Sequence, residues 1–355
     1  MFARLKTFPL TTEAGMGVGK KIAIGVGGLL GVLVLVGVGG YVWAGSTAGA
    51  KLSAVHDVHR VDFPIPFPLT DSDIEALRAE RAAAAKPAKG ADVLAGVDLN
   101  AIAAERAVAR GKHLTEAIYG CTGCHGVDFG GGTMVDDPAI GKILGQNLTL
   151  GTGSRTLKYT AADWDRMVRH GVRPDGTGSP MPSKDFFAMS DQELSDIVSY
   201  IRSMPPVNKE VPPVMLGPLG KVLLATGQIP LSADQHPTKH VIDHAKFPPP
   251  SVADATFGKH LAQTCSGCHR DNFAGGPIVG GPPDWPPARN LTPSGLVGYA
   301  YEDFARVLRE GKRKGGEALL EPMAGMTQYT SKMTDVELQA LWAYIKDLPP
   351  TPTNK

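Results

Sequence analysis

The stretch "CTGCH", residues 121–125, contains two cysteines in a Cys-x-x-Cys pattern followed directly by a histidine. "CSGCH" at residues 265–269 repeats this pattern, and the two stretches contain all four cysteines of the 355-residue chain. No cysteine remains for a disulfide or a catalytic thiol outside them. The chemistry of these two stretches therefore decides which class of fold and function the sequence encodes.

Three kinds of site use a Cys-x-x-Cys pair: a zinc site, a redox-active dithiol and the covalent attachment of haem c. A zinc ribbon places its second pair about 15–20 residues after the first, whereas here the second pair begins 144 residues later. A thioredoxin-like dithiol follows a strand, whereas "ERAVARGKHLTEAIYG" and "ATFGKHLAQT" predict helices that run into a turn. The pattern therefore predicts two haem c groups. The residues expected to hold them by thioether bonds and by imidazole ligation of iron are Cys121, Cys124 and His125, and Cys265, Cys268 and His269.

The sequence around the cysteines is an internal repeat. "GKHL" at 111 returns at 258, "NLT" at 147 returns at 290, and "MSDQELSDIVSYIRSMPP" at 189 corresponds to "MTDVELQALWAYIKDLPP" at 333. We therefore expect each haem to lie in its own copy of one domain, residues 96–206 and residues 255–355.

Each copy is expected to close with an amphipathic helix that begins at a capping box, Ser190 with Glu193 in the first copy and Thr334 with Glu337 in the second. The helix before each cysteine pair carries a glycine at which the closing helix could approach closely. The expected contacts are Gly111 with Tyr200 and Gly258 with Tyr344.

Residues 22–43 carry no charge, and as a helix they would extend about 33 Å, enough to cross the hydrocarbon core of a bilayer. Arg4, Lys6, Lys20 and Lys21 precede them against one acid, which predicts that residues 1–21 stay in the cytoplasm. A cleaved signal peptide is the rival, since "AGA" at 48–50 is a tolerable cleavage sequence, but the apolar run is longer than that of a signal peptide. We therefore predict a retained single-pass anchor, residues 22–44, in the inner membrane with the haem domains on the periplasmic side.

Two segments outside the repeats are expected to be connections. Residues 45–95 predict a tether with extended proline-rich geometry and one short helix, in which His56 and His59 are solvated. Residues 207–254 form a proline-rich inter-domain segment that could pack across both domains. His236, His240 and His244 there have the spacing of one helix face, but Pro237 argues against a regular helix, so no metal site is predicted. A net charge of +1 gives no support for nucleic-acid binding.

The second axial position of each iron decides between an electron carrier and a catalyst. In the first copy Met181 lies on a proline-flanked loop and is the expected ligand, whereas Met189 precedes the closing helix and is expected to pack against it. In the second copy both Met323 and Met326 are candidates, and Met323 is preferred because it also follows a proline. His113 and His260 recur in "GKHL" and are expected to be structural.

These residues resemble the class I c-type cytochromes, specifically the multi-haem cytochrome subunits of membrane-bound alcohol and sugar dehydrogenases. The likeness covers residues 96–350 and is carried by "CTGCHG", "CSGCHR", "NLT", "GVRPDG" followed by "MP", and "EPMAGMTQYTSKMTDVEL". It implies an all-α fold wrapped around each haem. Together with the predicted anchor, which is not the usual arrangement of these subunits, the expected architecture is all-α, with two tandem class I cytochrome c domains preceded by a single transmembrane helix. The likeness also implies His125 with Met181 and His269 with Met323 as the iron ligands, and Thr330 and Met333 fit the family's methionine loop. The sequence departs from these subunits in having two haem motifs where they usually carry three.

The expected function is a membrane-anchored dihaem electron carrier, not itself an enzyme. Its redox partners would be a quinol-oxidising complex, a dehydrogenase or a terminal oxidase on the outer face of the membrane. The alternative is a dihaem redox enzyme of the peroxidase or thiosulfate-oxidising type. A peroxidase would keep one iron position open, yet both copies have a methionine in the matching loop, and a thiosulfate enzyme of the familiar kind would need a fifth cysteine.

Overall fold

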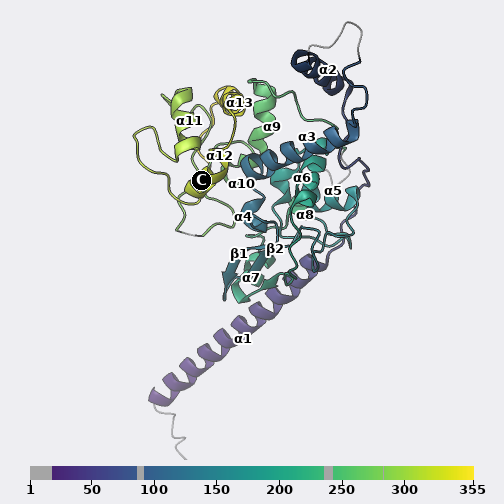
Figure 1. Cartoon of the computed structure of the whole chain (residues 1–355). Helices are drawn as coiled ribbons and strands as arrows, with labels where there is room; N and C mark the ends of the chain where they lie inside the picture. The colour runs from purple at the N-terminus through teal and green to yellow at the C-terminus, as the bar shows by residue number, and fades with distance from the viewer. Residues whose placement is uncertain (1–17, 86–91, 236–242, 283) are drawn as a thin grey trace, which may run out of the picture.

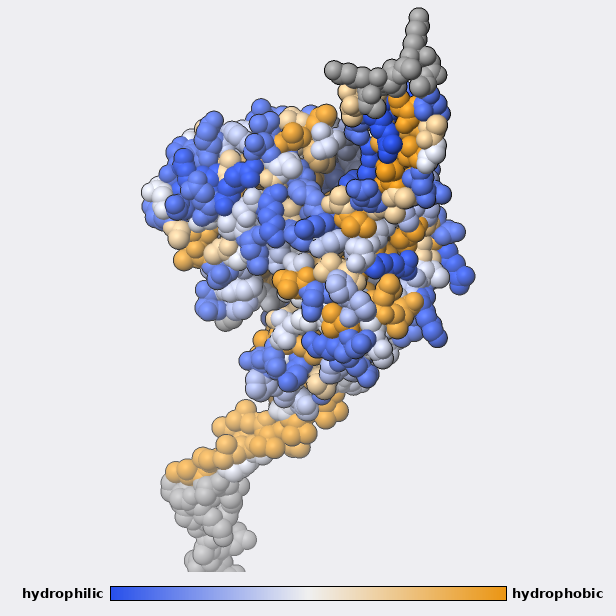
Figure 2. Space-filling view, in the orientation of Figure 1, coloured by the Kyte–Doolittle hydropathy of each residue, from blue (hydrophilic) through white to orange (hydrophobic). Residues whose placement is uncertain are grey.

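The computed structural model describes residues 18–85, 92–235, 243–282 and 284–355, and most of these residues are helical or lie in loops (Figure 1). A long helix, α1 (Val18–Ser53), projects from a body that contains the two repeats. Within the described residues it is long and apolar enough to cross a membrane over Val26–Ser53. Figure 2 shows it as an apolar rod beside a surface of mixed polarity.

The first repeat contains α3 (Leu99–His113), a π-helical turn η1 (Leu114–Ile118) and the single turn α4 (Thr122–His125). The helices α5 (Ala161–His170) and α6 (Asp191–Ser203) follow, with the 3₁₀ turn η2 (Ser183–Phe186) between them. The second repeat contains a corresponding series of helices and turns in the same order. These are α9 (Ala255–Ala262), η3 (Gln263–Cys265), α10 (Ser266–His269), α11 (Tyr301–Glu310), α12 (Met323–Thr330) and α13 (Asp335–Lys346).

The predicted closing helices are confirmed as α6 and α13. Ser190 and Thr334 each accept the backbone N–H of the glutamate three residues on, and both capping boxes are complete. The predicted close approach at a glycine is also confirmed. A Cβ at Gly111 would lie 2.0 Å from the carbonyl oxygen of Asp196, and one at Gly258 would lie 1.9 Å from that of Ala340. Only glycine permits either helix pair to pack at this distance.

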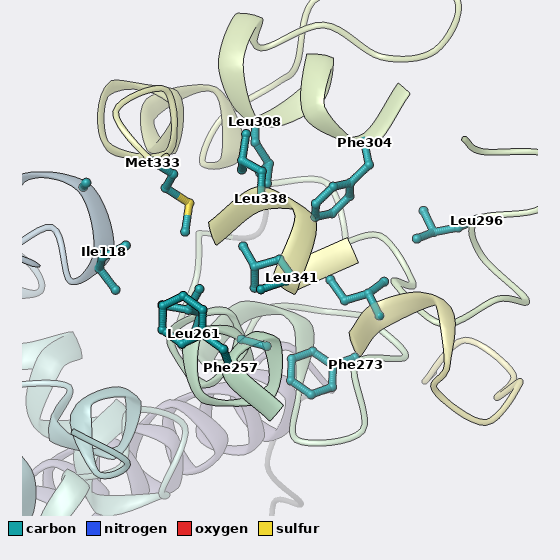
Figure 3. Packing of buried hydrophobic residues seen from close by; sticks show 14 residues of the cluster. Ile118, Phe257, Leu261, Phe273, Leu296, Phe304, Leu308, Met333, Leu338 and Leu341 are labelled. Carbon is teal, nitrogen blue, oxygen red and sulfur yellow. The ribbon is translucent and has the colours of Figure 1, made fainter. Parts of the chain in front are cut away.

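Each repeat has its own hydrophobic core. That of the second repeat is built from α9, α11 and α13, and Figure 3 shows Phe257, Leu261, Phe304 and Leu338 pointing into it. Ile118, from η1 of the first repeat, lies in the same core. The two domains therefore share an interface and do not hang from a flexible connection.

A small antiparallel sheet interrupts the helical fold. Its strands are β1 (Gly132–Asp137), β2 (Gly141–Gly145) and β3 (Met215–Leu216), in the order β1-β2-β3. The prediction of an all-α fold overlooked this sheet, because its strands are very short and one comes from outside the repeat. The second repeat has prolines at the corresponding place, in "GGPPDWPPAR", and proline cannot donate a ladder hydrogen bond.

The segment predicted as a tether is packed along much of its described length. Helix α1 continues through residue 53, and Ala44 and Ala48 are buried against α7 (Pro218–Ala225). Phe63 and Phe67 are buried in the core of the first repeat. Burial of each phenylalanine contributes roughly 1.5–3 kcal/mol, so this stretch is docked on the first domain and is not a free tether. Helix α2 (Asp71–Ala85) then leads to α3.

The proline-rich segment after α6 packs on the first domain and on the end of α1. It contains α7 and a further short helix, α8 (Ser232–Gln235). Lys51 at the end of α1 donates to the carbonyl oxygen of Leu224 in α7, 3.1 Å away. His236 and His240 lie outside the described residues.

Two candidate haem sites

Each cysteine motif forms a tight helical turn. In the first, the amide of His125 donates to the carbonyl of Cys121 at 3.1 Å. Residues three and four apart on a helical turn face the same side, so Cys121, Cys124 and His125 present two sulfurs and one imidazole together. The second motif has the same form in η3 and α10.

The environment of the thiols argues against a redox dithiol. Burial raises the pKa of Cys121 to about 12 and that of Cys265 to about 11. A redox-active Cys-x-x-Cys site needs a lowered pKa to form its thiolate, so these pairs have the opposite electrostatics.

Both motif histidines are oriented by the same hydrogen bond. The Nδ1 of His125 donates to the carbonyl oxygen of Gln146 at 2.8 Å, and the Nδ1 of His269 donates to that of Arg289 at 2.7 Å. A carbonyl can only accept, so the proton is on Nδ1 and the lone pair is on Nε2, the arrangement of an imidazole that binds metal. Burial also lowers the pKa of both rings, which keeps them neutral.

The repeated "NLT" holds the carbonyl that each histidine uses. Asn147 follows Gln146, and its side-chain amide donates to the carbonyls of Val207 and Lys209 at 2.7 and 2.9 Å. Its oxygen accepts from the amide and the hydroxyl of Thr149. Asn290 makes the equivalent bonds to Thr292 and to the carbonyl of Thr351. The role of "NLT" in holding this carbonyl was not predicted from the sequence, where the motif served only as a repeat and as part of the family resemblance. Its spacing of about 20 residues after each motif histidine was the available signal.

The residues present fit haem c at both motifs. Two neutral thiols, one histidine with a free Nε2 and a carbonyl that fixes its orientation occur twice with matching geometry. Two covalently bound haem c groups are therefore the cofactors of this chain.

The candidate methionines differ in their surroundings. Met181 is partly buried on the loop after α5, and Met323 is partly buried at the start of α12, against the core cluster that also contacts Cys265. Met326 is 43% exposed. Met189 and Met333 are buried in the cores, as expected for residues that pack against the closing helices. Met181 and Met323 remain the predicted ligands.

His113 and His260 make reciprocal contacts between the domains. The Nε2 of His113 lies 2.7 Å from the Oε1 of Glu337, in the capping box of α13. The Nε2 of His260 lies 2.8 Å from the Oε1 of Glu193, in the capping box of α6. Each domain thus inserts its "GKHL" histidine at the start of the other's closing helix, a structural role across the interface.

Both cysteine motifs lie at this interface. Tyr329 of α12 packs on the first motif, where its hydroxyl oxygen would lie 2.3 Å from a Cβ at Gly123. Asp185 of η2 packs on the second motif, where its carboxylate would lie 2.4 Å from a Cβ at Gly267. Burial raises the pKa of Asp185 to about 6. Each motif is therefore in contact with the domain that carries the other.

Comparisons with known proteins find the same family in both repeats. The cytochrome c family profile matches residues 108–205 and 255–349, each within one repeat. The cytochrome c subunit of a quinone alcohol dehydrogenase from Gluconacetobacter polyoxogenes is 27% identical over 256 residues, 66% of this chain and 53% of the relative. The cytochrome subunit of fructose dehydrogenase from Gluconobacter japonicus is 23% identical over 266 residues, 68% of this chain and 52% of the relative.

A third relative has a more similar length. A dihaem c-type cytochrome from Cereibacter sphaeroides is 23% identical over 257 residues, 65% of this chain and 82% of the relative. The dehydrogenase subunits are longer, and this chain spans about half the length of those relatives.

Proposed function

This chain belongs to the cytochrome c family, and from that premise we propose that it is a membrane-anchored dihaem electron carrier that serves redox partners on the outer face of the membrane. The observation that carries the proposal is the matched pair of motif histidines, each oriented by a backbone carbonyl. When bound, haem supplies a one-electron iron couple. The chain supplies ligands, burial and a fixed arrangement of the two sites.

We assign the second axial ligand of each site to a methionine, Met181 and Met323. A thioether raises the reduction potential of haem iron, and an iron with both axial positions filled suits electron transfer. The partly buried position of Met323 and the exposure of Met326 support this choice in the second domain.

The anchor proposal rests on how α1 ends. Its apolar side chains from Val26 to Trp43 are largely exposed, whereas Ala44 and Ala48 are buried. Tyr41 and Trp43 lie at this change, as aromatic residues do at a membrane surface, and the Nζ of Lys221 lies 5.6 Å from the centroid of the Tyr41 ring. Cleavage after "AGA" would remove two packed alanines of α1, which favours a retained anchor over a signal peptide.

The partners are proposed from the relatives. Those named above are cytochrome subunits of quinone alcohol dehydrogenase and fructose dehydrogenase, so a dehydrogenase is the first candidate donor. A quinol-oxidising complex or a terminal oxidase remains open as donor or acceptor.

The test is the ligation of the full-length protein with both haems attached. We expect its oxidised form to show the near-infrared charge-transfer band of methionine-ligated ferric haem at an intensity for two sites. The variants Met181→Ala and Met323→Ala should each remove about half of the band and lower the potential of one haem.

Met326→Ala is the matched control, three residues from Met323 and exposed, and it should leave the band unchanged. Loss of the band in Met326→Ala but not in Met323→Ala would reverse the assignment in the second domain. A wild-type intensity for only one site, or none, would contradict the carrier and favour a dihaem redox enzyme with an open iron position.

A further inference from the structure

A group of three histidines and one aspartate comes together outside both cysteine motifs. The members come from three segments that are distant in sequence: the stretch before the first domain, α5, and the stretch between the domains. We call this group the three-histidine cluster, and it consists of His59, Asp165, His170 and His244.

The cluster is buried. Asp165 and His170 have no exposed side-chain surface, the side chain of His244 is 4% exposed and that of His59 is 17% exposed. The surrounding residues include Phe187, whose ring centroid lies 4.9 Å from that of His244, and the buried Val58 and Val172. Three imidazoles in an apolar setting are costly unless they are well bonded.

The ligand atoms have the separations of a small metal site. The Nε2 of His170 lies 3.0 Å from the Nε2 of His244, and these two atoms lie 3.7 and 3.9 Å from the Oδ1 of Asp165. A triangle with these sides has a circumradius of about 2.1 Å, which is the length of a zinc bond to histidine nitrogen or carboxylate oxygen. One ion at that point could contact all three atoms.

His59 is the candidate for the fourth ligand. One ligand atom each from His59, Asp165 and His170 all lie within 4.8 Å of one another. The rings of His59 and His244 are stacked with centroids 6.3 Å apart. The cluster therefore consists of two overlapping triads, one with His59 and one with His244, that share Asp165 and His170. Together they offer three imidazoles and one carboxylate, the number and kind of ligands that zinc prefers.

The carboxylate is prepared for such a role. Its Oδ1, the atom used in the triangle above, accepts from the Nε of Arg169 at 2.7 Å and lies 2.6 Å from the Nη2 of the same guanidinium. Ligating carboxylates are commonly held by further hydrogen bonds of this kind. Its Oδ2 is buried and has no hydrogen-bond partner among the described residues. Arg169 also binds Asp191 at 2.9 Å, so its positive charge is shared between two carboxylates.

We propose that the three-histidine cluster binds one divalent first-row metal ion, zinc by the type of its ligands. With four protein ligands the site would be closed and structural, not catalytic. The ion would join α5 to the stretch that follows α1 and to the stretch between the domains. It would thereby fix the first domain to the membrane end of the chain.

The test uses the full-length protein in detergent with both haems attached. The sample is stripped with a chelator, incubated with Zn²⁺, freed of unbound metal by gel filtration and analysed for zinc and iron by mass spectrometry. Because covalent haem iron serves as the internal standard, we expect about one zinc for every two irons. X-ray absorption at the zinc edge should show imidazole scattering and nitrogen or oxygen neighbours at about 2.0–2.1 Å.

The variants His170→Gln and His244→Gln should lower the zinc-to-iron ratio at least about tenfold, with the ratio of iron to protein unchanged. His56→Gln is the matched control, because it removes a histidine of the same stretch outside the cluster, and it should retain zinc. Wild-type protein that keeps no more zinc than His170→Gln would overturn the proposal. So would a zinc-edge spectrum without imidazole, which decides the question even if a variant does not fold.

Discussion

At the scale of single residues, one glycine in each domain sets the distance between two helices. Replacement of Gly111 by alanine would place a Cβ 2.0 Å from the Asp196 carbonyl oxygen and 2.8 Å from the Tyr200 Cβ. In a helix with free space around the glycine, this change would stabilise the protein by roughly 0.5–1 kcal/mol. At Gly111, however, α3 and α6 must move apart to make room for the methyl group. We expect Gly111→Ala to lower the free energy of unfolding by about 1–3 kcal/mol, measured by denaturant titration of the haem-loaded protein.

The control is Gly49→Ala in α1, where an added Cβ meets nothing within 4 Å. It should raise the free energy of unfolding by roughly 0.5–1 kcal/mol, the ordinary effect of alanine in a helix with free space around the residue. The close-approach account fails if the two variants behave alike.

These glycines also show which residues sequence reasoning can place. Gly111 and Gly258 were assigned correctly because each contact lies within one repeat and appears twice. The three-histidine cluster was missed because His59 and His244 are 185 residues apart and belong to segments that look like connections. No local sequence pattern predicts that Phe63 and Phe67 pack in the core of the first domain, and it is this packing that places His59 close to α5.

At the scale of elements, the loop that begins at Gln146 links the cofactor histidine to the segment after α6. Replacement of Asn147 by alanine would leave the carbonyls of Val207 and Lys209 without the amide that they accept from. We expect Asn147→Ala to cost about 1–3 kcal/mol of unfolding free energy, measured with the haem-loaded protein, since buried polar groups lose their partners.

Gln146→Ala distinguishes the side chain of this residue from its backbone carbonyl. The carbonyl that His125 uses stays in place, and within the described part of the chain the Gln146 side chain makes two long hydrogen bonds of 3.3 Å and no others. The variant should therefore be nearly neutral. A cost equal to that of Asn147→Ala would show that the loop is not held by the asparagine.

The sheet illustrates why some elements could not be predicted. Gly141 of β2 pairs with Leu216 of β3, 75 residues away, and β3 has only two residues. Pairing of this length leaves no periodic pattern of apolar residues. The capped helices α6 and α13, by contrast, carry their start signals and their buried face within one local stretch, and both were predicted.

At the scale of the whole molecule, the two domains are held by reciprocal contacts in which each packs on the other's cysteine motif. Ile118 enters the core of the second domain, and Tyr329 and Asp185 pack on the two motifs. His113 and Glu337 form one of the two polar links between "GKHL" and a capping box. A change at this link should therefore be felt by both domains.

The strength of the His113 link should depend on pH. The hydrogen bond to Glu337 raises the pKa of His113 above its ordinary 6.5, against the effect of partial burial. Burial of Glu337 favours a higher pKa, but the hydrogen bond from His113 and that from the Thr334 backbone lower it below the ordinary 4.5. The stabilisation from His113 is fully present below pH 6.5 and is lost as the pH rises through its raised pKa. The stabilisation from Glu337 is fully present above pH 4.5 and is lost as the pH falls through its lowered pKa. Both contributions are complete between pH 4.5 and pH 6.5, so the link is strongest in that range.

His113→Gln removes the charge but keeps a polar side chain of similar reach. We expect it to lower the free energy of unfolding by about 1 kcal/mol within that window, a value reduced for the partial exposure of His113. The difference from wild type should shrink as the pH is raised well above 6.5. Lys112→Gln removes a positive charge from the exposed neighbouring residue, and its effect should be small at every pH. Equal losses for His113→Gln at low and high pH would mean that shape, not the charged pair, holds this edge of the interface.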